Sequence, residues 1–294
     1  MEKYLEPLLP HLENEMSEQK PERIAKVIAR AGLCSRREAE RWINDGRVRV
    51  NGKTLESPAL TVDATNIILV DGKPLPQAQE TRLWRYHKPT GLVTSHSDPQ
   101  GRPTVFEKLP QTMVRVISIG RLDLNSEGLL LLTNDGELAR RLEMPSTGWV
   151  RRYRVRVRGT VDQNKLKSLQ NGVTVAGIKY DTIEAGLDSE TRTNAWLTVA
   201  LTEGKNREIR KVMEHLDLSV NRLIRLSYGP FQLGKLERGQ VDEVPAKILR
   251  DQLSGDGPKA TGKFRGAGWA TAKKSPKQLR SIKKPTLSLK NTKK

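Results

Sequence analysis

Four consecutive leucines, residues 129–132, directly follow a polar loop and constrain the fold more than any other feature of the chain. A short, unbroken apolar run that begins after a glycine-containing turn predicts a buried β-strand. The preceding loop, residues 120–128, places Asp123 between two leucines and two residues after Arg121. A carboxylate in apolar surroundings loses hydration and needs a nearby cation to stay ionised. The sequence therefore predicts an ion-paired acid beside a buried strand, and its role is either structural or catalytic.

Length and residue usage favour a protein of the reducing cytoplasm. A chain of 294 residues, 36% of them hydrophobic, is long enough for two folded units with tails. Cys34 is the single cysteine, which rules out an intrachain disulfide or a cysteine-based zinc site, and the four histidines lack ligand spacing. The acidic N-terminus does not resemble a signal peptide, and no run of eighteen apolar residues occurs. We expect no membrane span, no metal and no cofactor.

The net charge of +18 indicates a polyanionic partner, with nucleic acid the leading candidate. The charge is unevenly distributed, because residues 254–294 carry 12 Lys and Arg against one acid. This tail is predicted to be disordered, either adding salt-sensitive RNA affinity or acting as a solubilising spacer.

Helix and strand patterns alternate without a repeating βαβ rhythm, which predicts an α+β fold on a mixed, mainly antiparallel sheet with flanking helices. The expected divisions are an acidic extension (1–19), a small basic domain (20–75), a linker (76–81), a larger domain (82–253) and the basic tail (254–294).

The small domain shows two helical patterns and a hairpin. Apolar residues at 24, 27, 28 and 31 predict the first helix, and Ser35 with Glu38 forms a capping box for the second. Asn51-Gly52 is a favoured tight turn. Arginines at the start of the second helix suit an RNA phosphate, although an ordinary solvated helix face explains them equally well. The run from Ala29 to Ala39 resembles the S4 domain, an RNA-binding module, and implies RNA contacts at Arg30, Ser35, Arg36, Arg37 and Arg41.

The larger domain contains a strand pattern at 150–158 whose arginines, at 152, 154, 156 and 158, share one face opposite Tyr153. A helical pattern at 206–216 carries further basic residues. Asp135 is explained as a helix cap, so it is not a catalytic candidate. No phosphate-binding loop, dinucleotide fingerprint or nucleophile elbow occurs, so any chemistry falls to acid, base, arginine and tyrosine side chains.

Four stretches in order, beginning at Tyr86, Gly120, Tyr153 and Leu201, resemble the ribosomal pseudouridine synthases that carry an N-terminal S4 domain. The resemblance covers about residues 20–250. It implies that Asp123 is the catalytic residue, that Tyr153 lies against the target base, and that Arg210 is the basic partner of Asp123. It also implies RNA contacts at Arg121, Lys205, Asn206 and Arg207.

The run 203–211, with residues 222–225, is most similar to the B-type enzymes that act on the large ribosomal subunit. We therefore expect 23S rRNA, or a large-subunit assembly intermediate, as partner of a monomeric protein. The same reaction on 16S rRNA is one alternative, and a non-catalytic S4-domain factor for ribosome assembly is another. An RNA phosphodiesterase is disfavoured because no cluster of metal-binding carboxylates or histidines is present.

Overall fold

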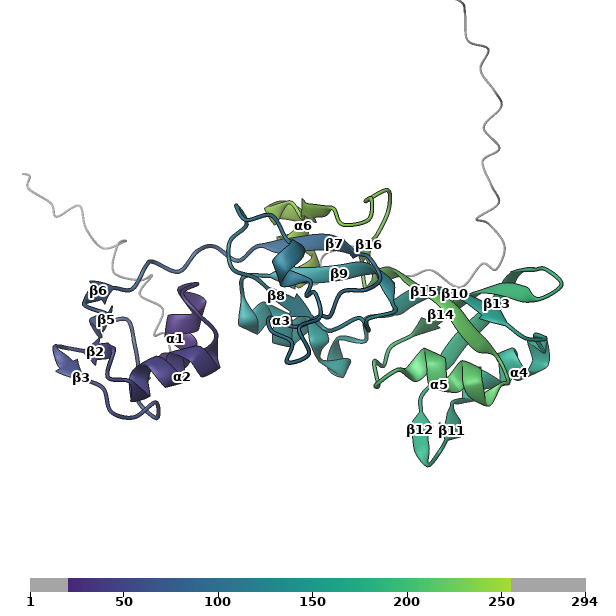
Figure 1. The fold of residues 1–294 in the computed structure, drawn as a ribbon, viewed down its shortest axis with the longest axis horizontal. Coiled ribbons are helices and arrows are strands. Elements are labelled where there is room, and N and C mark those ends of the chain that lie inside the picture. Colours follow the sequence, from purple (N-terminus) through teal and green to yellow (C-terminus); the bar gives the residue numbers. More distant parts are fainter. Residues whose placement is uncertain (1–20, 255–294) are drawn as a thin grey trace, which may run out of the picture. The chain divides into compact units, whose positions relative to one another are not determined.

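The structure is a computed structural model that describes residues 21–254 (Figure 1). The expected acidic extension, and all of the expected basic tail except Ser254, lie outside the described residues. Among the residues described, no helix is long and apolar enough to cross a membrane.

The small domain packs two helices, α1 (Ile24–Arg30) and α2 (Arg36–Asn44), against short strands. A two-stranded ladder pairs β1 with β4, and a four-stranded sheet has the order β3-β2-β5-β6. The strand bounds are β1 Glu22–Arg23, β2 Val48–Val50, β3 Lys53–Thr54, β4 Thr61–Val62, β5 Ile68–Val70 and β6 Lys73–Pro74. The core contains Ile24 and Ile28, two of the four apolar positions predicted for the first helix, with Val27 packed against it, and also Ala39 and Ile43 of α2.

The turns of this domain follow the sequence, with one exception. Asn51 and Gly52 both have positive φ, as a tight hairpin turn requires. Ser35 caps α2 by accepting from the Glu38 amide at 3.1 Å. The reciprocal half of the predicted capping box is wrong, because the Glu38 carboxylate turns outward and pairs with Arg41, one helical turn along.

The larger domain is built on a nine-stranded sheet with the order β13-β14-β10-β15-β9-β7-β17, to which β16 adds at β15 and β8 at β9. Its strands are β7 Leu83–Lys88, β8 Ile117–Ile119, β9 Glu127–Thr133, β10 Arg151–Arg158, β13 Ile183–Glu190, β14 Asn194–Leu201, β15 Ser219–Tyr228, β16 Phe231–Gln232 and β17 Val241–Glu243. Only β9 and β15 pair in parallel. This confirms the predicted mixed, mainly antiparallel α+β fold.

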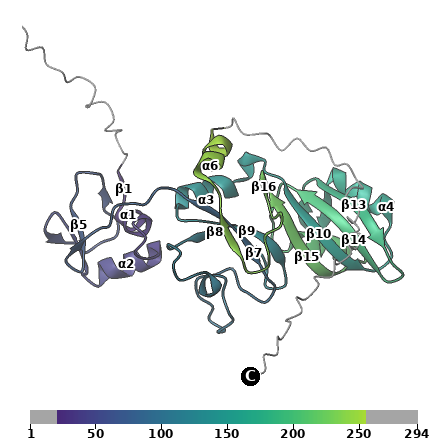
Figure 2. The ribbon, with the colours of Figure 1, turned by 90° about the horizontal axis from the view of Figure 1, so that it is seen from above.

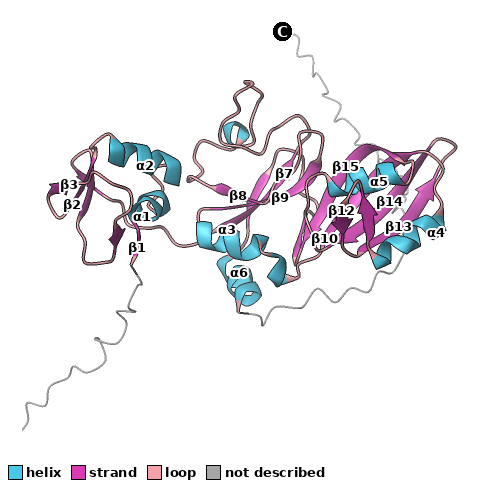
Figure 3. Cartoon of the chain, turned by 90° about the horizontal axis from the view of Figure 1, so that it is seen from below, coloured by secondary structure: helices cyan, strands magenta, loops and turns pink. Residues whose placement is uncertain are grey.

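Helices pack on both faces of this sheet (Figures 2 and 3): α4 and α5 cover one face at one end, and α3 and α6 cover the other face at the opposite end. The helices are α3 Gly136–Glu143, α4 Gln163–Ser168, α5 Glu208–His215 and α6 Ala246–Leu253, with short 3-10 turns η1 Phe106–Lys108, η2 Pro145–Thr147 and η3 Leu169–Asn171. A separate hairpin pairs β11 (Val173–Val175) with β12 (Ile178–Tyr180). One core lies under α4 and α5, and the other lies under α3 and α6.

Strand β9 is buried on both faces, as its run of leucines predicts. Leu130 and Leu132 belong to the first core, whereas Leu129 and Leu131 belong to the second. The parallel junction with β15 is very close at Gly128, where a Cβ would lie 2.3 Å from the Arg225 carbonyl oxygen. Only glycine fits there, so this residue fixes where the 120–126 loop leaves the sheet.

Candidate active site

Asp123 lies in the loop that joins β8 to β9, and the backbone of this loop is held from several directions. Lys88, at the end of β7, donates through Nζ to the carbonyl oxygens of Asp123 at 3.0 Å and Ser126 at 2.9 Å. The Gly91 amide donates to the Leu124 carbonyl at 2.8 Å. These hydrogen bonds hold the backbone of the loop in place and so fix the position of Asp123.

Lys88 is a site residue that sequence reasoning missed. It is fully buried, and its third hydrogen bond goes to its neighbour's carbonyl, Pro89 O, at 3.1 Å. Burial lowers the pKa of the Lys88 ammonium to about 8, partly opposed by the negative charge of Asp123. The available signal was a lysine at the end of a strand pattern, but this pattern does not distinguish a surface lysine from a buried one.

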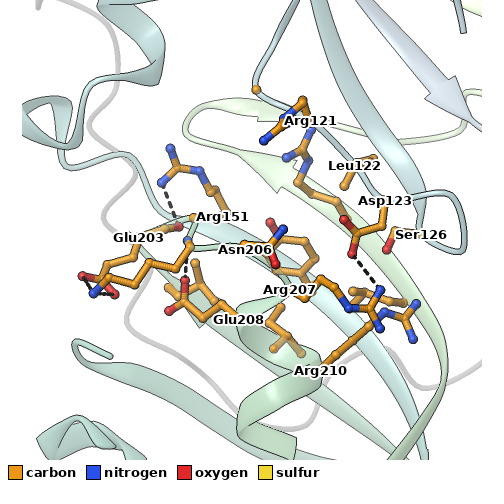
Figure 4. A pocket seen from close by; sticks show the side chains of 18 of the residues that line it. Arg121, Leu122, Asp123, Ser126, Arg151, Glu203, Asn206, Arg207, Glu208 and Arg210 are labelled. Carbon is orange, nitrogen blue, oxygen red and sulfur yellow. Dashed lines mark hydrogen bonds and ion pairs between the residues drawn. The ribbon is translucent and has the colours of Figure 1, made fainter. Parts of the chain in front are cut away.

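The Asp123 side chain is about one-third exposed (36%), so it is less buried than the flanking leucines predict. Its ion-pair partner is Arg207, whose Nη1 lies 3.6 Å from Oδ2 (Figure 4). The structure thus places Arg207, and not the expected partner Arg210, within ion-pair distance of Asp123. Arg210 instead donates to the Asn125 carbonyl at 2.9 Å and the Val220 carbonyl at 3.2 Å.

Arg210 nevertheless interacts electrostatically with Asp123. Burial and the adjacent Arg207 lower the pKa of its guanidinium, and the charge of Asp123 opposes that shift. Figure 4 shows both arginines beside the aspartate. Two cations therefore lie beside the Asp123 carboxylate, one in a direct ion pair and one at longer range.

Arg207 reaches Asp123 from an unusual backbone position. It precedes α5 with φ of +52°, a left-handed conformation that a side chain other than glycine adopts at a cost. Such conformations concentrate at functional sites, because the surrounding structure must hold them. The predicted helix over 206–216 therefore begins only at Glu208, after this turn.

The loop that carries Arg207 is anchored by Arg151 and Glu208. Arg151 is buried and donates to the carbonyl oxygens of Thr202 and Glu203, the latter at 3.1 Å, and to Tyr228 Oη at 2.8 Å. The buried Glu208 carboxylate accepts from the Lys205 amide at 2.9 Å, and burial raises the pKa of Glu208. Sequence reasoning missed both anchors, since Arg151 precedes the alternating arginines and Glu208 resembles an exposed helix residue.

A cavity of about 660 Å³ brings most of the predicted site together. Tyr153, from the buried face of β10, lines it with Asp123. Its wall also includes the expected RNA contacts Arg121, Lys205, Asn206 and Arg207, together with Arg210. The Lys205 ammonium is already paired with the Glu203 carboxylate at 2.8 Å, which raises the pKa of Lys205. The volume is that of a pocket for one nucleotide-sized group.

The expected RNA contacts of the small domain lie on α1 and α2. Ser35 caps α2, and Arg36 and Arg37 begin it on the exposed surface. Arg30 pairs with Glu22 at 2.6 Å, and Arg41 pairs with Glu38, so these two cations are partly neutralised. Within residues 21–254, no group of three His, Cys, Asp or Glu side chains could hold a metal ion.

A small basic domain therefore precedes a sheet domain whose cavity is lined by an acid, arginines and a tyrosine, an arrangement suited to an enzyme that acts on a polyanion. The sequence matches the S4 domain family over residues 22–68 and the RNA pseudouridylate synthase family over residues 82–215. An RNA pseudouridine synthase of Rickettsia felis is 50% identical over 228 residues, covering 78% of this chain and 99% of that protein. The chain belongs to the RNA pseudouridine synthases that carry an S4 domain.

Two further proteins are similar to this chain at lower sequence identity. The ribosomal large subunit pseudouridine synthase B of Yersinia pestis is 42% identical over 237 residues, covering 77% of this chain and 73% of that protein. A crystal structure of a pseudouridylate synthase has the same fold, with a TM-score of 0.55, 24% identity and coverage of 78% of this chain.

Proposed function

We propose that this protein converts one uridine of 23S rRNA into pseudouridine, in the cytoplasm, with Asp123 as the catalytic residue. The observation that carries the assignment of the acid is its place in the cavity, beside Arg207 and Arg210 and with Tyr153 in the same lining. The large-subunit target is supported by the similarity to synthases named for that subunit.

The reaction breaks the bond between C1′ and N1 of the uridine, turns the base, and joins C1′ to C5. The proton displaced from C5 is lost and N1 gains one, so substrate and product are isomers. Asp123, which lies beside the two guanidiniums, either adds covalently to the sugar or base or removes a proton so that the glycosidic bond breaks by elimination. The geometry is compatible with both routes.

The target base must leave its stack to enter the cavity, which costs a few kcal/mol. Stacking on Tyr153 returns about 1–3 kcal/mol of this cost, by analogy with single-strand binders. Arg121 is exposed on the rim of the same cavity, where it can fill the gap in the RNA or hold the displaced strand. Arg36 and Arg37 at the start of α2 add RNA affinity through phosphate contacts.

The test is to delete the gene and map the pseudouridines of both ribosomal RNAs by chemical modification and primer extension. The proposal predicts the loss of one site in 23S rRNA, restored by the wild-type gene and not by Asp123→Asn. Loss of a site in 16S rRNA instead would reassign the substrate, and restoration by Asp123→Asn would remove Asp123 from the chemistry.

A further inference from the structure

Strands β13, β14, β10 and β15 have two different faces. On β10, Tyr153, Val155 and Val157 point into the core beneath α4 and α5. Figure 3 shows these helices in front of the strands, and Figure 2, from the opposite side, shows the strands in front of α4. Tyr153 also lines the Asp123 cavity, so the second face lies on the other side of the sheet from that cavity.

This reverse side carries a group of basic residues around one tryptophan. Arg156 of β10 pairs in register with Trp196 of β14 and with Arg222 of β15, so these three lie in one row across the sheet. Arg154 and Arg158 flank the row along β10 because alternate residues of a strand share a face. We call Arg154, Arg156, Arg158, Trp196 and Arg222 the arginine face.

Trp196 orders two of these guanidiniums. The Arg154 guanidinium lies 4.5 Å from the centre of the Trp196 ring, and that of Arg222 lies 5.9 Å away. Cation–π stacking holds a guanidinium flat and leaves its N–H edge available for bidentate contact with a phosphate, although the Nε of Arg222 already donates to Glu127. Such an arginine loses less conformational entropy when it binds than one that is free to rotate.

The face has an excess of positive charge. Its four arginines share the surface with three acids, Glu127, Glu184 and Asp188, and Asp188 already accepts from Thr198 Oγ1 at 2.9 and 2.8 Å. Arg222 also pairs with Glu127. Arg156 and Arg158 are exposed. Alternate side chains on a strand are about 6.6 Å apart, which is comparable to the spacing of phosphates along one nucleic-acid strand.

We propose that the arginine face binds the sugar–phosphate backbone of a second RNA segment, remote from the uridine in the catalytic cavity. The inference depends on RNA as the substrate and is independent of which rRNA carries the target. The face would favour folded rRNA over a short hairpin, because only a larger RNA can reach both sides of the sheet.

The experiment measures RNA binding by the full-length protein against KCl concentration. One RNA is a full-length 23S transcript, and the other is a short hairpin centred on the mapped uridine. The test variant is R156Q/R158Q, and the matched control is K247Q/R250Q, which removes two exposed charges from α6. Turnover on the hairpin is measured for every variant to verify that the site is intact.

For R156Q/R158Q we expect the slope of log K against log salt on the 23S transcript to fall by about 1–2, from two lost phosphate contacts. Affinity for that transcript should weaken about tenfold at about 0.15 M salt, with hairpin affinity and turnover unchanged. An unchanged slope, or an equal loss in the control, would overturn the proposal. If wild-type protein forms no pseudouridine in either ribosomal RNA, the proposed function fails while this binding comparison remains valid.

Discussion

Replacing Lys88 with methionine tests whether the buried ammonium positions the catalytic loop. Methionine keeps most of the apolar stem but removes three hydrogen bonds, to Pro89 O, Asp123 O and Ser126 O. Hydrogen bonds from a charged donor contribute about 1.5 kcal/mol or more each, so the gross loss is about 4–5 kcal/mol. Against this, the lowered pKa of Lys88, about 8 instead of 10.5, corresponds to a burial cost of about 3 kcal/mol that the variant avoids.

The net loss of unfolding free energy is therefore only about 1–2 kcal/mol, and Lys88→Met should fold. Turnover should nevertheless fall by about a hundredfold or more, because a displacement of the acid by about 1 Å is enough for such a loss. The assay is single-turnover release of tritium from RNA that carries [5-³H]uridine, alongside urea unfolding. Lys108→Met, at an exposed lysine of η1, is the control.

The pH dependence provides a second measurement on Lys88. As pH rises through about 8, the folded amine loses its proton and has only two donors for three carbonyls, so wild-type turnover should decline. Between about 8 and 10.5 the unfolded state holds more protons, so the contribution of Lys88 to stability rises with pH over the same window. As pH rises above about 8, turnover should thus fall while the contribution of Lys88 to stability rises. Turnover of Lys88→Met at the wild-type rate would refute the positioning role of Lys88.

Three further substitutions separate the roles around the cavity. Gly128→Ala should destabilise the protein by about 3 kcal/mol or more, because its Cβ would meet the Arg225 backbone; urea unfolding measures this, and a loss under about 1 kcal/mol would contradict it. Arg207→Ala should change stability by less than about 1 kcal/mol, since its ion pair with Asp123 is part-exposed, yet reduce turnover in the tritium assay; full turnover would count against the pair. Arg210→Ala should cost about 1–3 kcal/mol as well as activity, because carbonyls of the catalytic loop and β15 lose their donor; a stability equal to that of Arg207→Ala would show that these contacts contribute little.

The sequence was sufficient to predict the elements whose pattern depends only on adjacent residues. The leucines of β9, the alternation of β10, the Ser35 cap and the Asn51-Gly52 turn all formed as expected, because adjacent residues alone determine them. The sequence did not reveal β15 as a central strand. This strand mixes Arg222 and the buried Arg225 among its apolar residues, and its pairing with β9 joins residues about a hundred positions apart.

The composition of the site was more predictable than its contacts. Asp123, Tyr153 and Arg210 do line one cavity, as the family resemblance implies. The identity of the ion-pair partner depended on the left-handed turn at Arg207, which directs that side chain toward the acid. Such a turn depends on tertiary anchors, and no local pattern in the sequence signals it.

The most direct test of the central claim is single-turnover tritium release by Asp123→Asn with excess enzyme on a 23S rRNA transcript. The substitution keeps the size of the side chain and removes only its charge and basicity. We expect no tritium release above background, with RNA affinity within about threefold of wild type because the phosphate contacts lie elsewhere. Release at a rate near that of the wild-type protein would contradict it.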